Sequence, residues 1–284
     1  MEVLVGIVFV LMYVVIVSEK IHRTIAAMLG ATIMMLMGVM TQETALHHVD
    51  FNTLGLLVGM MILVGVTGHT GLFDYVAIKA AKLAKAEPRR ILIYLAIITA
   101  VFSAFLDNVT TVLLMVPVTF SITQKLHLKP NAFLLTQIIA SNVGGTATLI
   151  GDPPNIMIGS AVGLNFMDFI ANLTAICILI FIVVEAVLIF VYRNDLHTQP
   201  DLQQKVMRLN ASSQIADRAL LKKCLLVIAV TIAMFVLHGS LGLDTATAAL
   251  TGAGLLLLIT YTRDEAMIAK VFSKVEWLAI FFFA

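Results

Sequence analysis

Two polar segments interrupt very apolar stretches of the chain, and their side chains are of types that bind ions. The first is Asp107-Asn108-Val109-Thr110-Thr111, and the second runs from Ser141 to Asn155. An ionised aspartate at the centre of a bilayer costs roughly 2.5–3.5 kcal/mol. Broken backbone at that depth is tolerated where it is buried in protein or lines a watery cavity. Two such breaks indicate a place that holds an ion or a polar solute.

The oxygen-rich composition of the two segments favours Na⁺, proton exchange or an oxyanion over Zn²⁺. Thr110 and Thr111 are expected to cap the second arm of a hairpin, and Asp107 to ligate a cation or exchange a proton. Pro153-Pro154 is expected to start a half-helix. Helix ends that meet at mid-depth offer N–H groups to an anion and carbonyls to Na⁺. The predicted binding residues are Asp107, Asn108, Thr110, Thr111, Ser141, Asn142, Gly144, Gly145, Thr146, Thr148, Asp152 and Asn155. No cofactor or metal is expected except a Na⁺ ion at Asn108, Thr110 and Gly144.

Other polar residues of the apolar runs carry weaker signals. For a single Gly, Thr or Asn, helix packing is the alternative interpretation. Glu185 lies in an apolar run and is a candidate for proton coupling, or equally a protonated, hydrogen-bonded interior residue. The histidines and the two cysteines form no metal-binding pattern. We expect His47 and His48 in a surface loop, His69 and His238 at span ends, and Cys177 and Cys224 in packing.

The composition predicts an all-α polytopic membrane protein. Hydrophobic residues make up 60% of the chain and charged residues 12%, whereas a soluble domain carries about 25% charged residues. The N-terminus lacks the basic residues and cleavage site of a signal peptide, so its apolar run should stay as a span. Apolar runs of spanning length are expected near 3–18, 24–40, 51–68, 131–162 (interrupted), 172–192, 221–238 and 243–261.

The basic residues give the predicted orientation. With the N-terminus outside, all 18 Lys and Arg fall on the cytoplasmic side, in or beside loops 19–23, 71–90, 125–130, 193–220 and 263–274. Segment 91–124 has basic flanks at both ends and short arms, 91–106 and 112–124, so it is expected to be a re-entrant hairpin. Two thin spans joined by an external turn are the alternative.

Residues 71–88 are expected to form an interfacial helix with lysines opposite Leu72, Tyr75, Val76 and Leu83. Residues 194–219 are expected to be a polar linker without a catalytic pattern.

An internal repeat of opposite orientation is a further expectation. Residues 27–31 match 249–253 at an offset of 222, and 49–51 match 275–277 at an offset of 226. Where the loop after a span of one copy contains Lys or Arg, the loop after the matching span of the other copy contains none. We therefore expect a first repeat over 1–192, a cytoplasmic linker over 193–220 and the start of a second, truncated repeat over 221–284. Inverted repeats of this kind place a transporter's site at their interface, and a complete pair predicts a protein of roughly 420 residues.

Both polar segments closely resemble those of the ion-transporter superfamily, in the arsenite-permease and sodium–proton-antiporter branch with a citrate-transporter-like domain. The motifs that carry the resemblance are Phe105–Leu114 and Asn142–Asn155. The resemblance implies a homodimer with a scaffold and a moving transport domain, two hairpins and two unwound helices. It also implies elevator-type alternating access, with Asp107, Asn108, Thr110 and Thr111 at the hairpin tip and 142–148 and 152–155 in the unwound helix.

The predicted function is secondary active transport of a small ion, which is either Na⁺ or an anion such as arsenite, with coupling to H⁺ or Na⁺. The expected location is a bacterial or archaeal plasma membrane, and no nucleic-acid partner is expected. Sodium-coupled dicarboxylate carriers have a Ser-Asn-Thr tip, whereas this chain has Asp107-Asn108-Val109-Thr110. The extra carboxylate of Asp107 repels a dianionic substrate and therefore disfavours dicarboxylate transport. A carboxylate importer remains the alternative prediction. A membrane-embedded hydrolase lacks its motifs here, and a channel lacks a filter ring.

Overall fold

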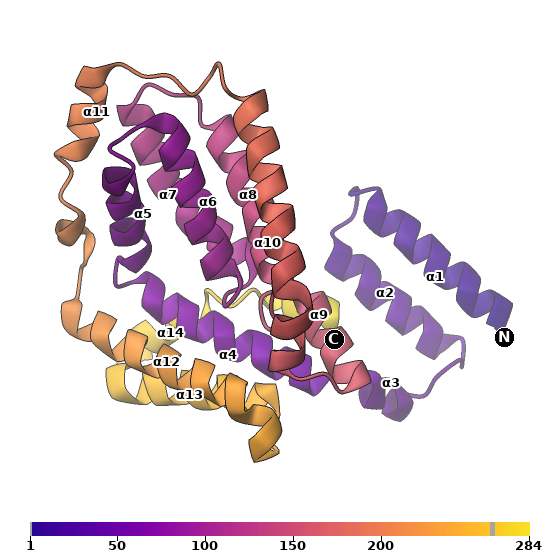
Figure 1. Ribbon diagram of the computed structural model, residues 1–284. Helices are drawn as coiled ribbons and strands as arrows, with labels where there is room; N and C mark the ends of the chain where they lie inside the picture. The colour runs from indigo at the N-terminus through magenta and orange to yellow at the C-terminus, as the bar shows by residue number, and fades with distance from the viewer. Residues whose placement is uncertain (1, 262–264) are drawn as a thin grey trace.

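The computed structural model describes residues 2–261 and 265–284, and every element in these ranges is helical (Figure 1). The expected all-α fold class is therefore confirmed. Residues 263 and 264 of the expected cytoplasmic loop lie outside the described residues. The helices are α1 (Glu2–Val17), α2 (Arg23–Leu36), α3 (Gln42–His48), α4 (Phe51–Gly68), α5 (Leu72–Leu83), α6 (Pro88–Ser103), α7 (Asn108–Lys125), α8 (Asn131–Thr146), α9 (Pro153–Val162), α10 (Phe166–Val191), α11 (Pro200–Met207), the 3₁₀-helix η1 (Ala211–Gln214), α12 (Arg218–Leu241), α13 (Thr245–Tyr261), α14 (Glu265–Phe272) and α15 (Trp277–Phe283).

Three described helices are long and apolar enough to cross a membrane, namely α4, α10 and α12. The apolar helices α1, α2 and α13 are shorter than this. Helix α10 begins at Phe166 rather than near 172, because Asn165 and Asp168 form a capping box around its first turn. Helix α12 begins at Arg218 rather than 221, because the Asp217 carboxylate accepts hydrogen bonds from the next free N–H groups.

The hairpin and the first half of the broken helix form one group of helices, whereas the second half packs against α4. Helices α6 and α7 are the arms of the hairpin, with a turn at 104–107, and α8 and α9 are separated by irregular backbone at 147–152. Helices α6, α7, α8 and α10 lie side by side (Figure 1). Both interruptions differ from the expected bounds: helix covers Asn108–Thr111 and 141–146, so each irregular segment is shorter than the polar segment that predicts it.

The buried apolar residues form two separate cores. One core lies among α5, α6, α7, α8 and the segment around α11, with Leu95, Ile122 and Phe133 at its centre. The other lies mainly among α4, α12 and α13. The hairpin turn and the helix break contribute Leu106 and Ile150 to this second core. The break therefore lies where the two groups of helices meet.

Helix α5 lies where an interfacial helix was expected, but its buried face is different. Residues Phe73 and Ala77 pack inside the protein, whereas Leu83 is 66% exposed. Tyr75 lies on the same side as Lys79, whose Nζ is 3.1 Å from the Tyr75 hydroxyl. The expectation that lysines lie opposite Tyr75 and Leu83 is therefore wrong. The small side chains on the other face let α5 approach α6 and α7 closely.

Candidate functional site

Asp107 begins the second arm of the hairpin. Its extended backbone and its Oδ1, which accepts a hydrogen bond from the Thr110 N–H at 2.9 Å, make it the N-cap of α7. The expectation that Thr110 and Thr111 cap this arm is wrong, because a carboxylate one position before the helix reaches the free N–H groups of its first turn. Capping leaves the second carboxylate oxygen of Asp107 available for a cation or a proton.

Asn108 joins the hairpin tip to the broken helix. Its Oδ1 lies 2.6 Å from the Ser103 hydroxyl, and its Nδ2 donates to Asn142 Oδ1 at 3.2 Å. The same Ser103 hydroxyl lies 2.7 Å from the Ser141 carbonyl oxygen. Because a hydroxyl carries one proton and both neighbours are acceptors, Ser103 can donate to either of them in turn. The two predicted segments therefore meet through one hydrogen-bonded network.

Two glycines leave the room that this contact requires. A Cβ on Gly145 would overlap Asn108 Oδ1, and a Cβ on Gly144 would overlap the Ala100 backbone of α6. The Gly144 carbonyl already accepts a hydrogen bond from Ala147 N–H. Gly145 therefore faces the site, whereas Gly144 serves the packing of α8 on α6. Only a residue without a side chain allows either approach.

The irregular segment after α8 is held by two polar side chains. The Asn155 Nδ2 group lies 2.9 Å from the Thr148 carbonyl oxygen and slightly further from those of Gly145 and Thr146. Thr148 donates to the Ala104 carbonyl of the hairpin turn at 2.5 Å and accepts from Gly151 N–H. Asn155 thus uses its amide nitrogen to satisfy carbonyls at the helix break, rather than offering an oxygen as expected.

Acidic groups gather around Asn108. The Asp152 carboxylate lies against the Asn108 side chain and near Asp107. Glu276, the residue before α15, is also close enough to Asp107 for their charges to interact, and the positive charge of Arg23 in α2 lies near Glu276 as well. Like charges at short range repel strongly where water is scarce. A cation or a proton is the natural partner of this arrangement.

The structure does not bring every predicted residue into the network. The Thr111 hydroxyl is fully buried and has no hydrogen-bond partner among the described residues, and the Thr146 hydroxyl bonds back to the Asn142 carbonyl within α8. Sequence reasoning missed Ser103, whose only signal was a hydroxyl four residues before Asp107 in an apolar run, and Gly151, which packs on Gly145. It missed Glu276 as well, because that residue lies 169 positions away from Asp107.

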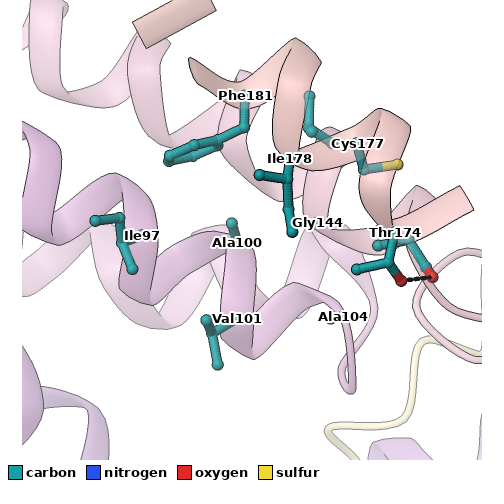
Figure 2. Close-up of a pocket in the computed structure, with 11 residues that line it drawn as sticks. Ile97, Ala100, Val101, Ala104, Gly144, Thr174, Cys177, Ile178 and Phe181 are labelled. Atoms are coloured by element: carbon teal, nitrogen blue, oxygen red, sulfur yellow. Dashed lines mark hydrogen bonds between the residues drawn. The ribbon is translucent and has the colours of Figure 1, made fainter. Parts of the chain in front are cut away.

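An apolar crevice lies behind the site, between α6, α8 and α10 (Figure 2). Its volume is about 330 Å³, and its walls include Ala100 and Gly144 on one side and Cys177 and Phe181 on the other. Thr174 closes one end by donating to the Ala147 carbonyl at 3.2 Å (Figure 2). The polar network and this crevice therefore share α6 and α8 as a common wall.

Apolar helices of spanning length, with a polar hairpin turn and a polar helix break beside them, are typical of an integral membrane protein. The comparisons with known proteins agree: residues 13–284 match the citrate transporter family model, and the chain belongs to that family. The family is described as a citrate transporter, and several mycobacterial relatives are named as transporters rather than enzymes.

Several curated proteins match nearly the whole of this chain. An uncharacterised transporter of Mycobacterium tuberculosis is 41% identical over 98% of this chain, which covers 64% of that relative. A 46 kDa membrane protein of Mycobacterium leprae is 38% identical over 98% of this chain and 65% of its own length. The human P protein is 33% identical over 96% of this chain and 41% of its own length. The chain thus spans less than two thirds of the length of these relatives.

Proposed function

We propose that the chain is part of a secondary active transporter that moves a small ion, Na⁺ or an anion such as arsenite, in exchange for or together with H⁺ or Na⁺. The observation that carries this proposal is Asn108, which links the hairpin tip to the broken helix while Asp107 and Asp152 lie beside it. Both interruptions present helix ends to the same point, as ion sites in transporters do. A bound Na⁺ at Asn108 and Thr110 is part of the proposal.

The charge of the site supports a cation or a weakly charged solute. Two carboxylates, Asp107 and Asp152, lie close to the amide that would contact a substrate. A dianionic carboxylate would be repelled by both. Asp107 can exchange a proton for Na⁺ without help from another group. Its single negative charge is balanced either by one bound proton or by one bound Na⁺.

The two cores support alternating access by movement of one group of helices against another. The hairpin and α8 share one core, and α4, α12 and α13 share most of the other. Leu106 and Leu149 attach the tip and the break to the second core through a few apolar contacts. Such contacts can be exchanged at low cost, because no buried ion pair fixes them in the described residues.

An inverted repeat is supported by two equivalent contacts. Ala246 N–H of α13 donates to Asn52 of α4, and the Thr24 hydroxyl of α2 donates to the Leu278 carbonyl of α15. Asn52 and Leu278 are 226 residues apart, and Thr24 and Ala246 are 222 apart, which are the two offsets of the sequence repeat. Each repeat therefore places its third span against the second span of the other.

The cellular setting is part of the same proposal. The distribution of Lys and Arg favours a plasma-membrane protein with an external N-terminus. The mycobacterial relatives favour a bacterial membrane. A homodimer is the expected assembly of the full-length protein, with the bilayer as its surroundings.

The test is ion-driven proton movement in proteoliposomes of the full-length protein, with Na⁺, arsenite and citrate added in turn. We expect Na⁺ or arsenite to move protons and Asp107→Asn to abolish the response. Asp217→Asn is the matched control, because Asp217 is also an N-cap, at α12, but lies outside the site. A wild-type protein that moves no proton with any of these solutes would contradict the proposal.

A carboxylate importer is the second candidate, since the matching family is described as a citrate transporter. In that case citrate should drive the flux, and Asp107→Asn should keep or increase it by removing a repulsive charge. Such a result would overturn the charge argument above.

A further inference from the structure

Four buried side-chain polar atoms lack hydrogen-bond partners in the described part of the chain, in His69, Thr111, Thr136 and Glu185. Two of these atoms, Glu185 Oε2 on α10 and Thr136 Oγ1 on α8, lie on neighbouring helices. Glu185 is 6% exposed and Thr136 is 1% exposed. A buried polar atom that makes no hydrogen bond is costly and rare in folded proteins. Two of them on helices that pack together require an explanation.

The register of α8 and α10 places these two residues at the same level. The Thr174–Ala147 hydrogen bond fixes how the two helices face each other (Figure 2). Glu185 lies eleven residues after Thr174, and Thr136 lies eleven residues before Ala147. The helices run in opposite directions (Figure 1), and eleven residues are about three turns. Both residues therefore lie on the contacting faces, about 16 Å from the Thr174 contact.

In residues 2–261 and 265–284, no charged group that could balance a carboxylate faces Glu185 from the elements packed around it. Helix α8 carries no ionisable side chain, and α12 meets α10 near Phe166, nineteen residues from Glu185. On α10 itself, Arg193 lies over the Phe190 ring beyond the helix end. The remaining ionisable groups of α6, the outer parts of α10 and the adjoining linker are Arg89, Arg90, Tyr94, Asp168, Cys177, Tyr192, Asp195 and His197. Of these, Arg90 pairs with Glu87, and Asp195 with Lys129.

We propose that Glu185 and Thr136 form a proton-binding site that is distinct from the ion site at the hairpin tip. The two groups make no hydrogen bond with each other in the structure; when the proton is bound, rotation of the Glu185 side chain brings the carboxylic acid O–H to donate to Thr136 Oγ1. When the proton leaves to water, the Thr136 hydroxyl donates to the carboxylate instead. The apolar crevice ends near Phe181, one turn from Glu185, and separates this pair from the polar network.

The position of this pair on α8 gives it a route to the ion site. Ser141 and Asn142 lie on the same helix, five and six residues beyond Thr136. An ionised Glu185 without a cation favours water entry between α8 and α10, which loosens the packing of α8. Protonation of Glu185 would then be coupled to the state of the hairpin tip. This coupling rests on the proposed transport function, whereas proton binding itself does not.

Infrared difference spectroscopy of the full-length protein in lipid nanodiscs, titrated with acid and base, tests the proton site directly. We expect a carboxylic-acid C=O band that titrates in the wild type and is absent in Glu185→Gln. Thr136→Val should move the band to higher frequency, because the acid loses its hydrogen-bond acceptor, and Thr136→Ser should restore it. Glu43→Gln, at an exposed acid in α3, is the control and should leave the band unchanged.

A band that persists in Glu185→Gln, or the absence of any titrating band, would overturn the inference. An unchanged band in a well-folded Thr136→Val protein would remove Thr136 as the positioning residue. Transport assays separate this inference from the proposed function. If the band titrates but no solute drives a flux, the transport proposal fails and the proton site stands. If transport occurs and its pH dependence is unchanged in Glu185→Gln, only the coupling fails.

Discussion

At the scale of single residues, Asp107 performs two tasks that substitution can separate. It caps α7 through the Thr110 N–H, and it brings a negative charge to the site. Asparagine is as good an N-cap as aspartate but carries no charge. We expect Asp107→Asn to keep the wild-type melting temperature and lose ion-driven proton flux. Asp107→Ala should also lose about 1 kcal/mol of stability.

The measurement is thermal unfolding of the purified variants beside the flux assay. Equal melting temperatures of the alanine and asparagine variants would show that the cap contributes nothing. Full flux in the asparagine variant would show that the charge is dispensable.

Gly145 provides a second residue-scale prediction. A methyl group at this position would occupy the space of Asn108 Oδ1, which would break the contacts of Asn108 with Ser103 and Asn142. We expect Gly145→Ala to weaken ion binding by at least about tenfold, or ~1.4 kcal/mol. Calorimetry or a filter-binding assay of the transported ion measures this. Gly254→Ala is the control, because no atom lies within 4 Å of a Cβ at that position. Wild-type affinity in Gly145→Ala would contradict the assigned geometry.

At the scale of helices, sequence reasoning located the hairpin and the broken helix but misjudged where each arm begins. It placed Asn108–Thr111 in the tip, whereas the structure has them in the first turn of α7. The error arose because Asp107 was considered only as an ion ligand and not as a cap. The capping box at Asn165 and Asp168 was readable, and it would have given the start of α10. By contrast, the buried face of α5 depends on which other helices pack against it. The sequence pattern of α5 alone does not contain that information.

Within the site, sequence spacing could bring together residues of one segment but not of two. The Asn108–Asn142 contact follows only once α6 and α8 pack along each other. Thr136 and Glu185 likewise lie at the same height along α8 and α10 only because the Thr174–Ala147 hydrogen bond sets the register of these two helices.

The end of α4 gives a prediction about pH. His69 Nδ1 lies 2.8 Å from the Gly65 carbonyl, and since a carbonyl can only accept, the proton of the neutral ring is on Nδ1. Burial lowers the pKa of His69 below its ordinary value of 6.5, and the Lys274 ammonium lowers it further. The hydrogen bond to Gly65 opposes this pKa change, and Lys270 adds to it. The folded protein therefore binds this proton less readily than the unfolded chain does.

For a group whose pKa is lowered by folding, the stability that it contributes is full above the unfolded value and is lost as the pH falls toward the folded value. The melting temperature of the solubilised protein should thus fall between about pH 7 and pH 5. His69→Gln should flatten part of this fall, and Lys274→Met should do so more weakly. His47→Gln, in α3, is the control. The same pH dependence in wild type and His69→Gln would show that His69 is not responsible.

At the scale of the whole molecule, the two equivalent contacts describe a pseudo-twofold arrangement of α2 with α15 and of α4 with α13. Gly30 of α2 packs against Met12 of α1, and Gly252 of α13 packs against Thr231 of α12, so the first two spans of each proposed repeat also meet at matching glycines. Close approach at small residues is how membrane helices associate. The most extensive of these pairings, α4 with α13, joins the two proposed repeats, and in the proposed transport mechanism it holds the scaffold while the hairpin moves.

This arrangement predicts paired cysteine cross-links on opposite sides of the membrane. In a background with Cys177 and Cys224 replaced by serine, we expect oxidation to join Asn52→Cys to Ala246→Cys, and Thr24→Cys to Leu278→Cys, because each pair is in hydrogen-bond contact. The inverted orientation adds a further requirement for single cysteines at exposed loop positions: an impermeant thiol reagent should reach Glu43→Cys from outside the cell and Lys20→Cys only after permeabilisation. Labelling of both positions from the same side would exclude the inverted repeat even if both cross-links form. If neither pair forms a cross-link, the third span of each proposed repeat does not pack against the second span of the other. The proposed scaffold, against which the ion site is proposed to move, would then be excluded as well.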